Sequence, residues 1–307
     1  MRFRPHLYLL GANLLYGVNY HIAKIALNGW IPPLGFIVLR VIVALILFAL
    51  FQRMFIREKV ERKDMPLLAL CGLFGVAINQ LCFFQGLYMT SEIHASLIMI
   101  ATPLLVLLVG WISGREGITV RKGAGILLGA AGLAWLVGQS AGPSSRTASL
   151  TGDLLILVNA TSYGIYLALV KPLMQRYHPV TVVTWVFFFG LFAVVPVGAG
   201  QLPQIEWAAL PSEVWWSILF VLVGSTFLAY LFNMLALKEV NASVVSIYIY
   251  TQPLIATLIA VLSGNDVLHW SMLGSGVMIG AGVWLVSQPG RLWQGSPSPA
   301  TVPAQKS

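Results

Sequence analysis

Amide and phenol side chains recur at helical spacing within the most apolar parts of this 307-residue sequence. Asn13, Tyr16 and Tyr20 are three and four positions apart and share one face of a helix, as do Asn159 and Tyr163 further along. Such groups donate and accept hydrogen bonds without a charge, which suits the binding of a polar or amphipathic solute. The residues that we expect to line a substrate-binding cavity are Asn13, Tyr16, Tyr20, Asn79, Gln80, Asn159, Tyr163, Trp185, Tyr248 and Gln252.

The simpler alternative for each of these polar side chains is a hydrogen bond between two helices, worth well under about 2 kcal/mol in a membrane. For Trp185 the alternative is ordinary packing. Stripes that converge from several helices favour a shared cavity over scattered contacts. We therefore predict that they meet near the centre of the fold.

Four further residues could kink helices or gate the cavity. Pro103 and Pro253 fall inside apolar segments, where proline offers no amide hydrogen and crowds the carbonyl four residues earlier. A bare carbonyl in lipid is costly, so such breaks should face protein, water or solute; a packing kink is the alternative. Lys24 and Lys171 lie near helix ends, where we expect them to reach the membrane surface or to gate.

The sequence offers little support for catalysis. It contains no GxSxG, no HExxH and no Asp-rich motif, so we predict no enzyme, no cofactor and no metal site. Its acidic residues fall in loops or at the ends of apolar segments, which argues against a carboxylate relay at the centre. We expect His21 and His94 to be structural, and Arg40 to tie helices together through backbone carbonyls.

Composition predicts an all-α membrane protein. The chain is 58% hydrophobic and only 9% charged, whereas soluble domains have roughly 25% charged residues. The net charge of +8 sits in short clusters between apolar runs, without a basic face, so we expect no nucleic-acid partner but a lipid bilayer. A spanning helix needs about 20 apolar residues. The ten predicted spans are 6–28, 33–53, 65–88, 92–113, 121–139, 151–172, 179–200, 213–236, 243–263 and 270–287.

The positions of the basic residues orient these ten spans. With the N-terminus in the cytoplasm, nearly all Lys and Arg residues in the loops and termini lie on the cytoplasmic side of the membrane. Only Arg146 lies on the external side. A miscounted span would invert every later loop and destroy this asymmetry. The sequence therefore predicts a multi-pass protein of a bacterial inner membrane with both termini in the cytoplasm.

An internal repeat divides the chain into two halves. Tyr16, Gly17 and Lys24 recur 147 positions later as residues 163, 164 and 171, and Pro103 recurs 150 positions later as Pro253. Five spans in each half place the second half upside down, an inverted repeat typical of secondary transporters. The predicted organisation is a first repeat at 1–138, a linker at 139–150, a second repeat at 151–288 and a disordered cytoplasmic tail at 289–307.

The chain resembles the drug/metabolite transporter superfamily, in its EamA-like bacterial branch. The segments that carry the resemblance are LLYGVNYHIAKIAL, PLGFIVLRVIVALILF, GLFGVAINQLCFFQGLYMTSEIHASLI, ATPLLVLLVGWISGREGITVRKGAGILLGAAG and YTQPLIATLIAVLSG. No single segment is specific, but their order and their repetition are. The resemblance implies a ten-helix carrier, often an exporter of amino acids or related metabolites.

The sequence favours one class of membrane protein, the transporters. The repeat and the polar stripes favour a secondary transporter, an exporter of small organic metabolites such as amino acids, that works by alternating access. A channel and a non-transporting scaffold or sensor are the alternatives. The series Gly125, Gly129, Gly132, Gly276 and Gly280 predicts close helix contact within each half; a homodimer built on these glycines is the weaker alternative.

Overall fold

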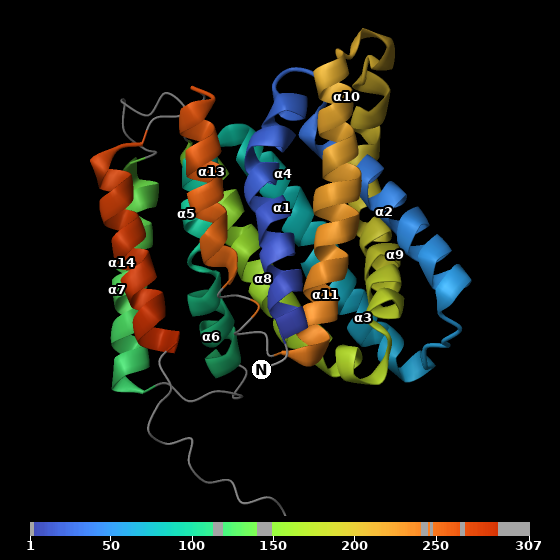
Figure 1. Ribbon diagram of the computed structural model, residues 1–307, viewed down its shortest axis with the longest axis horizontal. Helices are drawn as coiled ribbons and strands as arrows, with labels where there is room; N and C mark the ends of the chain where they lie inside the picture. The colour runs from blue at the N-terminus through green and yellow to red at the C-terminus, as the bar shows by residue number, and fades with distance from the viewer. Residues whose placement is uncertain are drawn as a thin grey trace, which may run out of the picture.

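The computed structural model describes residues 3–112, 119–139, 149–240, 245, 248–264 and 268–287. Every regular element in these ranges is helical (Figure 1). The predicted tail at 289–307 and most of the predicted linker lie outside the described residues. The α-helices are α1 (Phe3–Leu27), α2 (Pro33–Phe55), α3 (Met65–Gly72), α4 (Asn79–Met89), α5 (Glu92–Met99), α6 (Thr102–Ile112), α7 (Val120–Gln139), α8 (Leu150–Arg176), α9 (Pro179–Gly198), α10 (Ser212–Leu219), α11 (Ala229–Glu239), α13 (Thr251–Leu262) and α14 (Trp270–Ser287).

Several helical stretches are long and apolar enough to cross a membrane. Six of those in the described residues meet this condition, and Thr251–Leu262 and Trp270–Leu285 are shorter apolar helices. An all-helical membrane fold agrees with the sequence, because helices satisfy their own backbone hydrogen bonds in lipid. The count of ten spans stays a prediction. The six stretches are Pro33–Phe55, Arg62–Met89, Glu92–Val109, Leu150–Arg176, Pro179–Gln204 and Ser212–Glu239.

Local sequence explains where several of these helices begin. Pro33 and Pro179 stand at the first positions of α2 and α9, where a missing amide hydrogen costs nothing. Ser91, Ser149 and His178 each accept a hydrogen bond from a backbone N–H in the first turn of the following helix. Burial lowers the pKa of His178, which favours the neutral ring that can accept this bond.

Two long stretches contain wider π-helical turns. Leu73–Ile78 joins α3 to α4, and Phe220–Leu228 joins α10 to α11. A π turn leaves backbone carbonyls without their usual partner in the helix, and side chains serve them here. The Tyr230 hydroxyl donates to the Gly75 carbonyl at 3.0 Å, and the Thr226 hydroxyl donates to the Val221 carbonyl at 2.6 Å.

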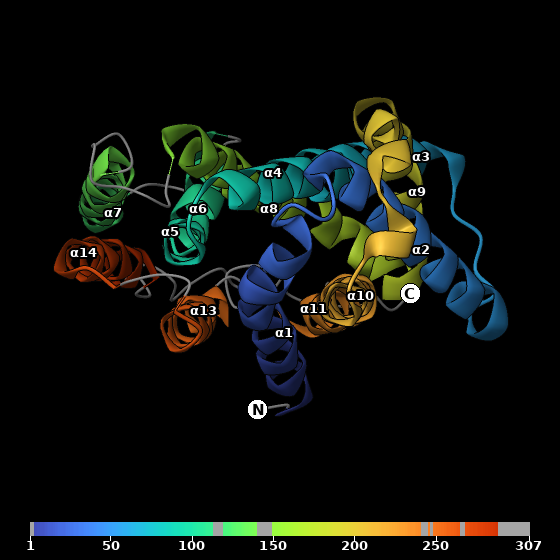
Figure 2. The same ribbon diagram turned by 90° about the horizontal axis from the view of Figure 1, so that it is seen from above.

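The arrangement of the helices places α1 at the centre of one face. Seen from above, α1 lies between α13 and α11 and opposite the row formed by α4 and α8 (Figure 2). The helices α2 and α9 pack together at one end of this row. The space between α1 and the row is therefore bounded by helices from distant parts of the chain.

A polar cluster ties the α8–α9 turn to the segment before α3. Asp64 accepts hydrogen bonds from Arg176 Nη1 at 2.8 Å and from the Tyr177 hydroxyl at 2.7 Å. The backbone N–H of His178 donates to Glu58 Oε2 at 2.9 Å. The predicted orientation puts this cluster on the cytoplasmic side.

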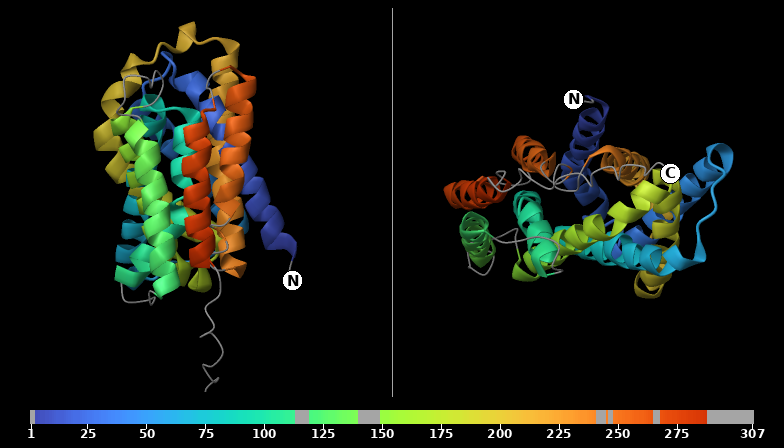
Figure 3. Two further views of the ribbon diagram at one scale, coloured as in Figure 1. Left: turned by 90° about the vertical axis from the view of Figure 1, so that its left-hand side faces the viewer. Right: turned by 90° about the horizontal axis from the view of Figure 1, so that it is seen from below.

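The glycine contacts correct one expectation from the sequence. Helices α7 and α14 pack side by side (Figure 3), so the main close contact joins residues 120–139 to residues 270–287 across the halves, although Gly129 also lies against Leu104 of its own half. A Cβ atom at Gly282 would lie 2.5 Å from the Gly125 carbonyl oxygen and 2.6 Å from the Gly129 nitrogen. The spacing showed that these helices have small faces but not which faces meet.

A methyl group at residue 282 should therefore push α7 and α14 apart. We expect Gly282→Ala to lower the free energy of unfolding by about 1–3 kcal/mol, because backbone atoms cannot move aside as a flexible side chain can. Thermal unfolding of purified protein in detergent measures this. Gly280→Ala is the matched control, since a Cβ atom there meets nothing within 4 Å. Equal melting temperatures for the two variants would contradict the close contact.

Candidate functional site

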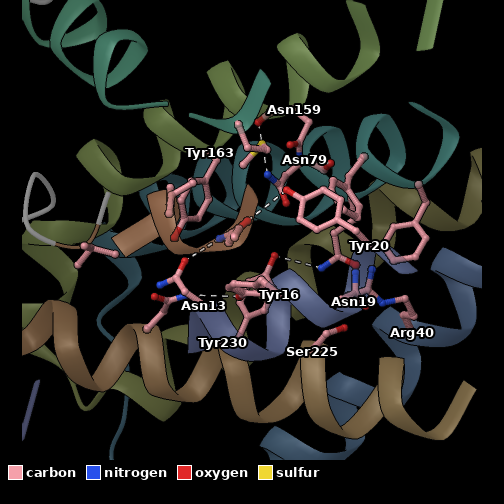
Figure 4. Close-up of a pocket in the computed structure, with 18 residues that line it drawn as sticks. Asn13, Tyr16, Asn19, Tyr20, Arg40, Asn79, Asn159, Tyr163, Ser225 and Tyr230 are labelled. Carbon is pink, nitrogen blue, oxygen red and sulfur yellow. Dashed lines mark hydrogen bonds between the residues drawn. The ribbon is translucent and has the colours of Figure 1, made fainter. Parts of the chain in front are cut away.

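A cavity with many polar residues in its lining lies where α1 faces α4 and α8 (Figure 4). Its empty volume, open solvent included, is about 660 Å³. Side chains from distant segments of the chain contribute to its wall. The lining residues are Asn13, Tyr16, Asn19, Tyr20, Arg40, Asn79, Gln80, Phe83, Phe84, Met99, Asn159, Tyr163, Ser225, Tyr230, Asn233, Val245, Ile249 and Gln252.

One hydrogen-bond network joins α1 to α13. Gln252 Nε2 donates to Asn13 Oδ1 at 2.6 Å, and the Tyr20 hydroxyl donates to Gln252 Oε1 at 3.1 Å. Asn13 Nδ2 in turn donates to the Leu9 carbonyl at 2.8 Å. The Tyr20 ring meets the Phe83 ring edge-on, with 5.4 Å between centroids. Gln252 thereby fixes the position of α13 against α1 at the cavity wall.

A second network joins α4, α8 and α11. Asn79 and Asn159 each donate from the side-chain amide to the other's backbone carbonyl, at 3.4 Å and 2.8 Å. Gln80 Nε2 donates to the Tyr230 hydroxyl at 3.2 Å, and Asn233 Nδ2 donates to the Tyr16 hydroxyl at 3.3 Å. These bonds fix the orientation of the amides, because their nitrogens are already engaged.

Four amide oxygens in the cavity wall lack a partner. The Tyr230 hydroxyl gives its proton to Gly75, so it can only accept from Gln80, and Gln80 Oε1 is left over. Within the part of the chain that the structure describes, these buried oxygens have no hydrogen-bond partner. An unpaired buried acceptor costs free energy, so a small rotation that brings one of these covered oxygens to an N–H or O–H group of a bound molecule would be stabilising. The four atoms are Asn19 Oδ1, Gln80 Oε1, Asn159 Oδ1 and Asn233 Oδ1.

Arg40 is the one charged residue among the described lining residues. Its side chain is 3% exposed, and Nε donates to the Thr226 hydroxyl at 2.8 Å. The guanidinium carbon lies 4.2 Å from the centroid of the Phe84 ring, a cation–π contact. The expected contact of Arg40 with backbone carbonyls is therefore wrong: a hydroxyl and an aromatic face hold it instead.

Buried pairs of histidine and carboxylate lie near one end of the helices that line the cavity. His94 Nδ1 is 2.9 Å from Asp153 Oδ2, and the Thr90 hydroxyl donates to Asp153 Oδ1. His21 Nδ1 is 3.4 Å from Glu92 Oε1. Both carboxylates are almost wholly buried. They lie at helix starts, as the sequence predicts, and their contacts join α1, α5 and α8.

Comparison with known proteins agrees with this architecture. The model of the EamA-like transporter family matches residues 4–138 and again residues 150–288. The chain belongs to the EamA-like transporter family. With its apolar helices, this makes it a multi-pass membrane protein whose relatives are transporters.

Relatives of this EamA-like protein are distant but cover most of its length. The uncharacterized transporter YyaM of Bacillus subtilis is 24% identical, over 91% of this chain and 93% of that protein. A probable terminal-alkyne amino-acid exporter of Streptantibioticus cattleyicolor is 25% identical over 74% of each chain. A crystal structure with 19% identity has a TM-score of 0.63 and covers 94% of this chain and 98% of its own, which shows a shared fold.

Eight of the ten residues that the sequence places in a cavity lie together in this one. Trp185 and Tyr248 are not among the lining residues. Trp185 packs against Phe188 and Phe189, and the Tyr248 hydroxyl lies 2.7 Å from His6 Nδ1. The residues that line the cavity together are Asn13, Tyr16, Tyr20, Asn79, Gln80, Asn159, Tyr163 and Gln252.

Sequence reasoning missed a wall of this cavity in the EamA-like protein. Tyr230 and Asn233 are three positions apart on α11, so the spacing rule used for α1 would have found them. Asn19 is next to Tyr20, on the edge of a stripe that was identified. Spacing could not identify Arg40 or Ser225, because neither has a second cavity-lining residue three or four positions away on its own helix.

The buried pair of His94 and Asp153 yields a stability prediction. His94→Leu would leave the Asp153 carboxylate buried without its imidazole partner, and the loss of a partner from a buried polar group costs about 1–3 kcal/mol. We expect a clearly lower melting temperature in detergent. The double variant His94→Leu/Asp153→Leu removes both polar partners and should recover part of the loss. A single variant as stable as the parent would show that the pair does not hold α5 to α8.

Proposed function

We propose that this protein is a secondary transporter that exports small organic metabolites such as amino acids across the bacterial inner membrane. The observation that carries the proposal is the cavity itself, a space between apolar helices that is lined by amide and phenol residues with unpartnered oxygens. A wall of amides and phenols can bind a polar solute without trapping it. The solute would cross the membrane unmodified and without the help of a cofactor.

Two five-helix halves of opposite orientation are part of this proposal. The family model matches the chain twice, at 4–138 and at 150–288. The π-helical segments begin at Leu73 and Phe220, with the same spacing of 147 that relates Tyr16 to Tyr163. Ten spans arranged in this way would place the cavity between the halves, where inverted-repeat transporters bind their substrates.

The helix breaks near Pro103 and Pro253 suit a moving wall. Helix α5 ends at Met99 and α6 begins at Thr102, while a short 3₁₀ turn at Tyr248–Tyr250 precedes α13. Met99 and Ile249 line the cavity, so both breaks border it. A broken helix can bend at the break with a smaller loss of backbone hydrogen bonds than a continuous one.

Support for an amino-acid cargo comes from two directions. A relative in Streptantibioticus cattleyicolor is named a probable terminal-alkyne amino-acid exporter. The amide side chains of the cavity wall could turn an unpaired oxygen toward an ammonium group and accept its hydrogen bonds. Lys171 has a structural role in this proposal. Its Nζ donates to the Leu237 and Val240 carbonyls at 2.7 and 2.5 Å and so caps the C-terminal end of α11. Lys24 keeps its proposed place near the other surface.

A channel is the main competitor and is separable by kinetics. In vesicles, a carrier saturates with substrate concentration and shows counterflow, whereas a channel does neither. A scaffold or sensor would show no flux at all. Proteoliposomes loaded with a panel of amino acids and assayed in both gradient directions therefore test the proposal, and no saturable flux of any solute would refute it.

Gln252 should be needed for transport because it joins α1 to α13 at the cavity wall. We expect Gln252→Ala to reduce the initial rate of transport about tenfold, as expected for the loss of two buried hydrogen bonds. Tyr248→Phe is the control, because Tyr248 bonds His6 outside the cavity, and its rate should stay near that of the parent. Equal rates in parent and Gln252→Ala, with equal amounts of folded protein, would mean that this cavity is not the transport site.

A further inference from the structure

The guanidinium of Arg40 is a buried charge without a described counter-ion. Isolated charges are expensive in a membrane protein, and they normally pair or meet water. The acidic residues in the described part of the chain do not line the cavity. Glu92 and Asp153, the two buried near one end of the lining helices, are next to His21 and His94 instead. The cavity therefore has a net positive charge located at one residue.

The contacts of Arg40 hold it in place but leave its ends free. Nε donates to Thr226, whose own proton goes to the Val221 carbonyl, so the hydroxyl is oriented to accept. The face of the guanidinium lies against Phe84. Neither Nη atom has a hydrogen-bond partner among the described residues. Two parallel N–H groups held in this way form the fork that binds a carboxylate with two hydrogen bonds.

Asn19 is a second residue of the cavity wall that offers an N–H donor. Asn19 lines the same cavity, is 3% exposed, and its side-chain nitrogen has no partner among the described residues. Figure 4 draws Asn19, Arg40 and Ser225 together in one part of the cavity. The Asn19 amide can add a third N–H donor to those of the guanidinium.

We propose that Arg40 binds the carboxylate of the solute, so that the cavity selects small organic acids and zwitterions over their neutral or cationic analogues. This inference rests on the proposed function and names the substrate class of that site. One guanidinium balances the single charge of a carboxylate, whereas a phosphate group with its larger charge would need further cations. The amides of Gln80, Asn159 and Asn233, whose oxygens are buried and unpaired, would accept from donor groups elsewhere on the solute after a small rotation.

A purely structural role for Arg40 makes a different prediction. Arginine that only braces helices would engage its terminal nitrogens with carbonyls or carboxylates, and its removal would lower stability without changing which solutes bind. A receptor changes the ratio of affinities between an acid and its amide. The ratio of affinities for an acid and its amide does not depend on the amount of folded protein in the sample.

The test measures binding to the full-length protein in detergent by calorimetry. The probes are L-leucine, L-phenylalanine and L-glutamine, each compared with its carboxamide, together with isocaproate, inorganic phosphate and glycerol 3-phosphate. We expect at least one acid to bind about tenfold or more tightly than its amide, since hydrogen bonds to charged groups are the strong ones. Arg40→Gln should abolish the difference, and Arg40→Lys should keep part of it.

Arg176→Gln is the matched control for charge. Arg176 lies outside the cavity and is half-exposed, so its removal changes the net charge equally and should leave the ratio unchanged. If Arg40→Gln does not fold, the comparison of acids with amides on the parent and on Arg40→Lys still decides. Equal affinity for acid and amide on the parent, or a ratio that persists in folded Arg40→Gln, overturns the proposal. Tighter binding of the phosphate compounds than of every carboxylate overturns it as well.

The outcome also separates this inference from the proposed function. Saturable transport of an uncharged solute that is indifferent to Arg40→Gln would leave the transporter intact and remove the carboxylate receptor. Binding of none of the probes, with no flux of any solute, would refute both. Acid-selective binding without flux would keep the receptor and refute the transporter.

Discussion

Backbone carbonyls that lose their helical partner inside a membrane must find another one, and this requirement shapes the whole bundle. The Tyr230 hydroxyl serves Gly75 at one π segment, and the Ser162 hydroxyl serves Phe74 beside it. The Thr102 hydroxyl serves the Met99 carbonyl at the α5–α6 break, at 2.7 Å. These donors come from hydroxyl side chains next to each interruption or on the facing helix. At each of these interruptions, a hydroxyl side chain therefore stabilises the exposed carbonyl.

The same requirement places the cavity. Interruptions bring polar side chains into the centre of the bundle, and Tyr230 both serves a carbonyl and lines the cavity. Its hydroxyl then has only its acceptor side left, which orients Gln80 and leaves the Gln80 oxygen free. Tyr230 therefore links a helix interruption to the cavity wall.

Sequence reasoning recovered the parts of this structure that depend on one helix at a time. The spacing of Asn13, Tyr16 and Tyr20 depends only on the helical period, and the three side chains do face one cavity. What the period cannot tell is which faces meet, so the contact of α7 with α14 was assigned to the wrong pairs of helices. The pairing of His94 with Asp153 joins positions 59 residues apart, and no local pattern announces it. Arg40 was recognised as buried, but its partners lie on other helices.

Charged side chains are paired at the two ends of the bundle but not, among the described residues, at its centre. At one end Asp64 binds Arg176, and near the other Asp153 contacts His94, so each end has a carboxylate in contact with a nitrogen side chain of another segment. Between them the cavity has one charge and no described carboxylate. A solute that brings its own carboxylate completes the pattern, because its charge neutralises Arg40 without a protein side chain. Binding would then replace an unfavourable buried cation with a neutral, fully hydrogen-bonded cavity, and this difference favours the occupied state.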